Sequence, residues 1–188
     1  FQKIKIKKFT NRINSTKAVG YLDLYKNKVI LVSGNGNFLF LDKNNLSENT
    51  KQITINSNLK NIIKDELFFS KTSSSFKDAI SVNDMLIEND TIYLSFAREI
   101  KDNCYNTSII KAKINTVFLE FENFFTYPEC EILDKSKSKR ELKFNAQASG
   151  GRMAIYTDNG SKKMLFTTGT FLINSNAQKD DSNLGKIL

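Results

Sequence analysis

The stretch GRMAIYTDNGSKKMLFTTG, residues 151–169, decides the fold because it recurs in altered form twice earlier in the chain. The earlier copies are VGYLDLYKNKVILVSG at 19–34 and VNDMLIENDTIYLSF at 82–96. In each copy, a strand-like segment reaches a polar turn, and a second strand-like segment follows. The second segment ends in a serine or threonine, and these residues, 62 and 73 positions apart, are Ser33, Ser95 and Thr168. A repeat at this interval indicates an architecture built from similar units.

Each of these units has room for one or two further outer strands. A four-stranded sheet that repeats at this interval is typical of a β-propeller blade. The sequence therefore predicts blade-like units at about 15–60, 78–130 and 145–188. Because a propeller removes its sheet edges only when the ring closes, we expect an all-β fragment that forms the first three blades of a six-bladed propeller. A β-sandwich with fortuitous internal similarity is the alternative.

The remaining composition agrees with one all-β domain. The chain has 188 residues, 40% of them hydrophobic, with only one proline and eight glycines, which is enough for a single core. QKIKIKKF at 2–9 alternates isoleucine with lysine, as a half-buried strand does. The Asn-Gly pair within 34–37 is typical of a hairpin turn. No segment carries an apolar helical stripe across three turns.

The chain carries a formal net charge of +8 at pH 7. Its lysines are scattered through every segment, and the one tight cluster is KSKSKRELK at 135–143, which we interpret as a solvated loop. No aromatic residues interleave with that cluster, as a surface for single-stranded nucleic acid would require, so we expect no nucleic-acid partner. No run of 18 apolar residues is present, so the sequence predicts no transmembrane helix.

The two cysteines, Cys104 and Cys130, leave two interpretations open. Without a CxxC motif and without any histidine, they cannot form a zinc site by themselves. They form either a disulfide between neighbouring strands, which would place the protein in an oxidising compartment, or two buried free thiols.

The last forty residues resemble the soluble quinoprotein glucose/sorbosone dehydrogenases. In that family a Gly-Gly-Arg opens a strand, an Asp-Gly turn follows, the next strand ends in Thr-x-Gly-Asp, and an Ala-Gln-Asp loop leads to Gly-Lys-x-Leu. The corresponding segments here, in the same order, are 150–152, 158–160, 167–170, 177–180 and 185–188. Residues 83–99 are similar to the preceding blade of the family, and the first eighty residues carry no matching motif.

The resemblance implies a six-bladed propeller, a pyrroloquinoline quinone (PQQ) cofactor, calcium and oxidation of a sugar hydroxyl. It also implies a histidine base just before the Gly-Gly-Arg and an aspartate that orients this base. The base position falls on Ala148, or on Gln147 if Ser149 is counted as an insertion, and the aspartate position falls on Thr170. With both groups absent, we expect weak or lost activity. The alternative is a non-catalytic propeller that binds a sugar or a protein.

Four residues are candidates for contacting a ligand: Arg152, Gln178, Gly150 and Gly151. For each there is a structural interpretation as well: Arg152 would join one blade to the next, the glycines would form a bulge or tight turn, and Gln178 would be a solvated loop residue. The adjacent carboxylates of Asp180 and Asp181 are only a weak indication of a calcium site. For Asp23 and Asp84, we expect hydrogen bonds to the backbone of turns. The resemblance, together with a disulfide, implies a periplasmic or extracellular protein.

Overall fold

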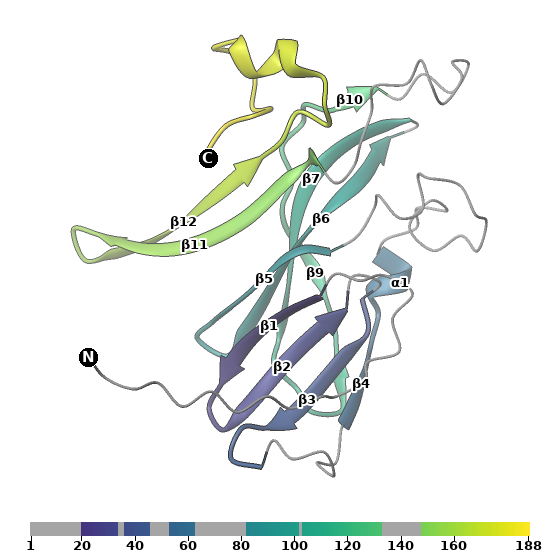
Figure 1. Cartoon of the computed structure of the whole chain (residues 1–188), viewed down its shortest axis with the longest axis vertical. Helices are drawn as coiled ribbons and strands as arrows, with labels where there is room; N and C mark the ends of the chain where they lie inside the picture. The colour runs from purple at the N-terminus through teal and green to yellow at the C-terminus, as the bar shows by residue number, and fades with distance from the viewer. Residues whose placement is uncertain (1–19, 34–35, 46–52, 63–81, 102, 133–147) are drawn as a thin grey trace, which may run out of the picture.

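The computed structural model describes residues 20–33, 36–45, 53–62, 82–101, 103–132 and 148–188 (Figure 1). These residues form three β-sheets with one short α-helix and a 3₁₀ helix, so the all-β prediction is confirmed. The strand expected at 2–9, the lysine-rich segment at 135–143 and the alternative base position Gln147 lie outside the described residues.

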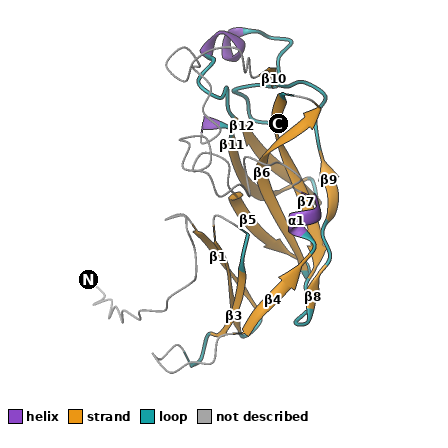
Figure 2. Ribbon diagram, turned by 90° about the vertical axis from the view of Figure 1, so that its right-hand side faces the viewer, coloured by secondary structure: helices purple, strands orange, loops and turns teal. Residues whose placement is uncertain are grey.

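The first sheet is an antiparallel meander with one added strand. Its strand order is β1-β2-β3-β4-β8. The bounds are β1 Gly20–Tyr25, β2 Lys28–Ser33, β3 Phe38–Asp42, β4 Ile53–Ser57 and β8 Phe118–Leu119. The helix α1, Leu59–Ile62, follows β4 directly. Strand β8 comes from much later in the chain and pairs with β4 in parallel at the edge of this sheet (Figure 2).

The second sheet has the strand order β10-β7-β6-β5, and β9 also pairs with β7. The bounds are β5 Val82–Glu88, β6 Thr91–Lys101, β7 Cys104–Lys113, β9 Glu122–Phe125 and β10 Glu131–Ile132. Asn89 and Asp90 join β5 to β6 with positive φ angles of 47° and 59°. Two such residues in succession give the turn that matches the twist of a tight hairpin.

The third sheet contains β11, Gly150–Asp158, and β12, Ser161–Thr168. Its hairpin turn is Asn159-Gly160, also with two positive φ angles. The end of the chain runs back along β12, since Phe166 and Leu188 exchange backbone hydrogen bonds of 3.0 and 2.8 Å. Between β12 and that end, the 3₁₀ helix η2 spans Asn174–Gln178.

The first strands of the three sheets lie next to one another, β1 beside β5 and β5 beside β11. Two aspartates connect them. Asp23 on β1 accepts the backbone N–H of Ile87 at 2.9 Å, and Asp84 on β5 accepts the backbone N–H of Met153 at 2.8 Å. Both carboxylates thus bond to backbone, although to the next sheet and not to a turn.

One apolar core runs through all three sheets. Its largest fully buried side chains include Phe38, Phe40, Phe96, Tyr105 and Phe171. The second and third sheets also meet through the rings of Phe125 and Phe166, whose centroids are 6.0 Å apart and nearly perpendicular. Edge-to-face contact of this kind adds to the burial of apolar area. The three sheets are therefore packed as one body (Figure 1).

The structure joins Cys104 to Cys130 as a disulfide, with their Cα atoms 5.4 Å apart. Cys104 is the first residue of β7, and Cys130 directly precedes β10, whose Ile132 pairs with Cys104. The bond therefore fastens the short strand β10 to the edge of the second sheet.

Candidate functional site

The segment that opens β11 is held by the second sheet through buried side chains. Ser95 on β6 donates its hydroxyl to the Gly151 carbonyl at 2.5 Å, and Thr107 on β7 donates to the Ser149 carbonyl at 2.5 Å. Asn83 on β5 donates its amide to the Ser149 hydroxyl at 2.7 Å. Three neighbouring strands thus fix the backbone on either side of Gly150.

Gly150 and Gly151 are required here for backbone reasons. Their φ angles are +76° and +105°, a region that favours glycine. The pairing of β11 with β12 shifts its register between Gly150 and Met153, which is the signature of a bulge. A Cβ atom on Gly151 would lie 2.6 Å from the Cβ of Asn83. The two glycines therefore lie at a β-bulge at the start of β11.

The two positions at which the family has its base and orienting carboxylate lie side by side. Phe171, which follows Thr170, donates its backbone N–H to the Ala148 carbonyl at 3.1 Å. Gly169, which precedes Thr170, donates to the Ser149 carbonyl at 2.6 Å. Ala148 and Thr170 are both half-buried. Neither side chain can accept a proton at neutral pH, so these two neighbouring positions offer no general base.

Arg152 connects all three sheets. Its guanidinium lies 3.1 Å from the Asp84 carboxylate on β5, and it stands over the Tyr21 ring of β1, 5.5 Å from the centroid. The Arg152 side chain is 71% exposed, whereas that of Asp84 is only 10% exposed. Burial is the main cause that raises the pKa of Tyr21, and Arg152 opposes the shift. Arg152 therefore joins one sheet to the next and still offers donor groups to solvent.

The loop between β12 and the end of the chain, residues 170–185, begins with a strained turn. Phe171 and Leu172 both have positive φ angles, 53° and 71°. For residues other than glycine, each such conformation costs about 1–3 kcal/mol. Phe171 is fully buried, so its ring packing and its bond to Ala148 hold this conformation. Strain of this kind concentrates at functional sites.

The rest of this loop carries the other sequence-predicted residues. Gln178 at the end of η2 is exposed, and so are Asp180 and Asp181. Lys186 donates its ammonium to the Ala177 carbonyl at 2.6 Å. In the part of the chain that the structure describes, no group of three or more His, Cys, Asp or Glu side chains could hold a metal ion.

Two glutamates beside the disulfide were not identified from the sequence. Glu129 accepts hydrogen bonds from the Ser182 hydroxyl at 2.6 Å and from the Asn183 backbone N–H at 2.5 Å. Glu131 accepts one from the side-chain amide of Asn176. The sequence signal is Glu-Cys-Glu at 129–131, but nothing in the sequence shows that these carboxylates face the loop.

Glu131 should make stability depend on pH. Burial is the main cause that raises its pKa, the nearby Glu129 carboxylate adds to the shift, and Asn176 and Lys179 oppose it. The folded chain therefore binds this proton more tightly than the unfolded chain. The stability it contributes is fully present below the unfolded pKa of a glutamate and is lost as the pH rises through the raised folded pKa.

Glu131→Gln removes this titration and keeps an oxygen for Asn176. We expect the variant to melt at a higher temperature than the wild type at about pH 7, and to lose that advantage at about pH 3.5, where both forms carry a neutral side chain. Circular dichroism melts at the two pH values would measure this. A variant that is no more stable than the wild type at either pH would contradict the burial argument.

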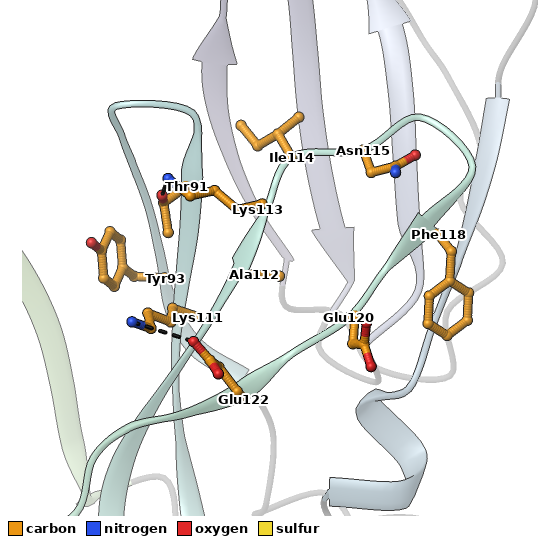
Figure 3. A pocket seen from close by; sticks show the side chains of 10 residues that line it. All are labelled: Thr91, Tyr93, Lys111, Ala112, Lys113, Ile114, Asn115, Phe118, Glu120 and Glu122. Carbon is orange, nitrogen blue, oxygen red and sulfur yellow. Dashed lines mark hydrogen bonds and ion pairs between the residues drawn. The ribbon is translucent and has the colours of Figure 1, made fainter.

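A groove of about 610 Å³ lies between the ends of β6 and β7 and the segment from β8 to β9 (Figure 3). Lys111 and Glu122 form an ion pair of 3.3 Å across it, and Lys113 donates to the Thr91 hydroxyl at 3.0 Å. Phe118 is partly exposed along one wall. No ligand-contact residue predicted from the sequence lines this groove.

The fold of this chain has counterparts among solved structures. Two solved structures resemble the chain, one named "glucose dehydrogenase" and the other described as "Crystal structure of glucose dehydrogenase", each with a TM-score of 0.57 and 14% sequence identity. The matches cover 89% of this chain and 46% and 42% of the two solved chains. This chain thus spans less than half the length of the proteins it resembles.

No protein-family model matches the sequence, and no curated protein matches it. The likeness to the two solved structures therefore concerns the fold. Within the described ranges, none of the helices has the length and apolar character needed to cross a membrane.

Proposed function

We propose that this chain forms part of a β-propeller of the glucose/sorbosone dehydrogenase type, with three blade-like units, and that its site binds a sugar. The fold likeness to glucose dehydrogenases supports this. So does the arrangement of β1, β5 and β11, since a propeller places the first strands of successive blades side by side around its axis.

The observation that carries the proposal is the contact between Ala148 and the residue after Thr170. The Phe171 N–H bonds to the Ala148 carbonyl at 3.1 Å, so these two positions are neighbours, as a base and its orienting carboxylate must be. The chain contains no histidine at all. General acid–base help is worth about 10²- to 10⁴-fold in rate. We therefore infer that quinone-dependent oxidation of a sugar hydroxyl is slow or lost here.

The described residues fit the implied cofactors in part. Arg152 commits one guanidinium nitrogen to Asp84 and, being largely exposed, has donors left for an anionic group such as a PQQ carboxylate. Calcium takes six to eight oxygen ligands, and the described ranges contain no cluster of three acidic side chains. PQQ, when bound, would supply the hydride acceptor. This chain would contribute Arg152 to hold the anion and Gln178 to hydrogen-bond a hydroxyl.

A non-catalytic propeller that binds a sugar or a protein is the second candidate. The exposure of Arg152 and Gln178 favours it, because both residues can bond to a partner without any proton transfer. The Cys104–Cys130 disulfide supports a periplasmic or extracellular location, since such bonds persist in oxidising compartments.

Binding measurements on the purified chain test the proposal. We expect PQQ to show a shifted absorbance on addition of the protein, and glucose to give a calorimetric binding signal. Arg152→Ala should weaken PQQ binding by about tenfold or more, through loss of a charge-assisted contact. Lys162→Ala is the matched control, because Lys162 lies on the same β11–β12 hairpin as Arg152 and, like Arg152, pairs with a carboxylate of β5, that of Glu88. Wild-type protein that binds neither PQQ nor glucose would overturn the proposal.

A further inference from the structure

The loop 170–185 meets the second sheet through the two carboxylates that flank Cys130. Asn176, Ser182 and Asn183, from both halves of the loop, donate hydrogen bonds to Glu129 and Glu131. The two ends of the loop are held by other contacts. The start follows the hydrogen bond between Gly169 and Ser149, and the end leads into residues 186–188, which pair with β12. Glu131 thus fastens the loop at η2, beside Gln178, where Lys186 also donates to the Ala177 carbonyl. Glu129 fastens it near its end, where the Thr168 hydroxyl also donates to the Asn183 carbonyl.

The backbone that carries these two carboxylates makes few contacts of its own with the second sheet. Strand β10 is only two residues long, Glu131–Ile132, and pairs with Tyr105 and Cys104. Glu131 is 7% exposed, so its charge is removed from water. Two like charges this close also repel each other. The Asn106 amide bonds to the carbonyls of Tyr127 and Glu129 at 2.5 and 3.3 Å, and the disulfide at Cys130 supplies the covalent attachment.

We propose that the Cys104–Cys130 disulfide sets the position of the loop 170–185 through Glu129 and Glu131, so that reducing the disulfide releases the loop that carries Gln178. Reduction breaks the S–S bond and adds two electrons and two protons from an external dithiol, which is itself oxidised. Glu129 and Glu131 then lose their covalent attachment to β7, and the hydrogen bonds that they accept from Asn176, Ser182 and Asn183 no longer hold the loop in place. The effect on a ligand rests on the proposed function, whereas the release of the loop does not.

Hydrogen exchange followed by mass spectrometry tests the release without any ligand. Oxidised and dithiothreitol-reduced protein are compared in peptides from 170–185, from the β11–β12 hairpin at 150–168 and from β5 and the start of β6 at 82–96. We expect exchange in 170–185 to rise by about tenfold or more on reduction, with the other two regions unchanged. The Cys104→Ser/Cys130→Ser double variant should behave as the reduced protein does.

Two variants test the role of the carboxylates while the disulfide stays intact. Glu129→Gln cannot accept both the Ser182 and Asn183 bonds in the original geometry and should raise exchange in 170–185. Glu122→Gln, which alters an exposed carboxylate paired with Lys111, should not. Unchanged protection of the loop on reduction would overturn the proposal. Loss of protection in 82–96 as well would also overturn it, because the bond would then support the whole fold.

The sugar readout separates this inference from the proposed function. If both hold, reduction weakens glucose binding by about tenfold while the melting transition of the sheets remains cooperative. If reduction frees the loop but neither form binds PQQ or glucose, the positioning role stands and the proposed function fails. If glucose binding is tight and the loop keeps its protection on reduction, the inference fails and the proposed function stands.

Discussion

Gly169→Ala should separate the segment at Ala148 from the segment at Thr170 and lower the free energy of unfolding by about 3 kcal/mol or more. A Cβ atom at Gly169 would lie 1.9 Å from the Ala148 carbonyl oxygen and 2.5 Å from the Ser149 carbonyl carbon. Both atoms belong to the backbone, so no side chain can turn aside to make room. The two segments must separate, and the Gly169–Ser149 hydrogen bond is lost with them.

Gly160→Ala is the matched control for this substitution. Gly160 has a positive φ of 79°, but a Cβ atom there would meet nothing within 4 Å. We expect a loss of only about 1 kcal/mol, from the left-handed backbone alone. Urea unfolding of both variants, followed by circular dichroism, would measure the difference. Equal losses in the two variants would show that the close approach at Gly169 relaxes without cost.

Asp84→Ala should lower the free energy of unfolding by about 2–3 kcal/mol. The substitution leaves the Met153 N–H without its acceptor in a region where Met153 is 8% exposed, and an unsatisfied buried donor costs about 1–3 kcal/mol. The substitution also removes the ion-pair partner of Arg152, but the Arg152 guanidinium is exposed and is solvated by water at little cost. Asp84→Asn keeps an oxygen for the Met153 N–H and should recover most of the loss.

Asp158→Ala removes a carboxylate of the same kind from the same part of the fold. Asp158 pairs with Lys163, but the two side chains are 41% and 50% exposed, and exposed pairs contribute about 0–1 kcal/mol. We expect the free energy of unfolding of Asp158→Ala to lie within about 1 kcal/mol of the wild-type value. If Asp84→Ala is as mild as this control, Asp84 is not a connection between the second and third sheets.

The parts of the fold that depend on local chemistry could be predicted from the sequence. The three hairpins fall at the polar turns in 19–34, 82–96 and 151–169, because the residues there tolerate positive φ and the flanking segments alternate. The segment ITINSNLKNI, residues 53–62, forms a strand only over Ile53–Ser57, and α1 begins at Leu59.

The long-range contacts could not be predicted in this way. Strand β8 is only two residues long and pairs with β4 of the first sheet, although β7 and β9, its neighbours in sequence, belong to the second sheet. Two residues are too few to show a periodicity. Glu129 and Glu131 look like surface carboxylates until the loop 170–185 is placed against them. The sequence allows the interpretation that Arg152 joins one unit to the next, but its contacts with Asp84 and Tyr21 are defined only once the sheets are packed together.

The turnover rate of protein that demonstrably holds PQQ tests the central claim most directly. The claim, made under the proposed function, is that Ala148 and Thr170 stand on neighbouring segments at the positions of a base and its carboxylate and cannot abstract a proton. Enzymes commonly turn over at about 10 s⁻¹, and losing general base help costs about 10²- to 10⁴-fold. With Ca²⁺, an aldose and an electron-accepting dye, and with bound PQQ verified by absorbance in the same sample, we predict a rate below about 0.1 s⁻¹. A rate of about 10 s⁻¹ or more would contradict the account.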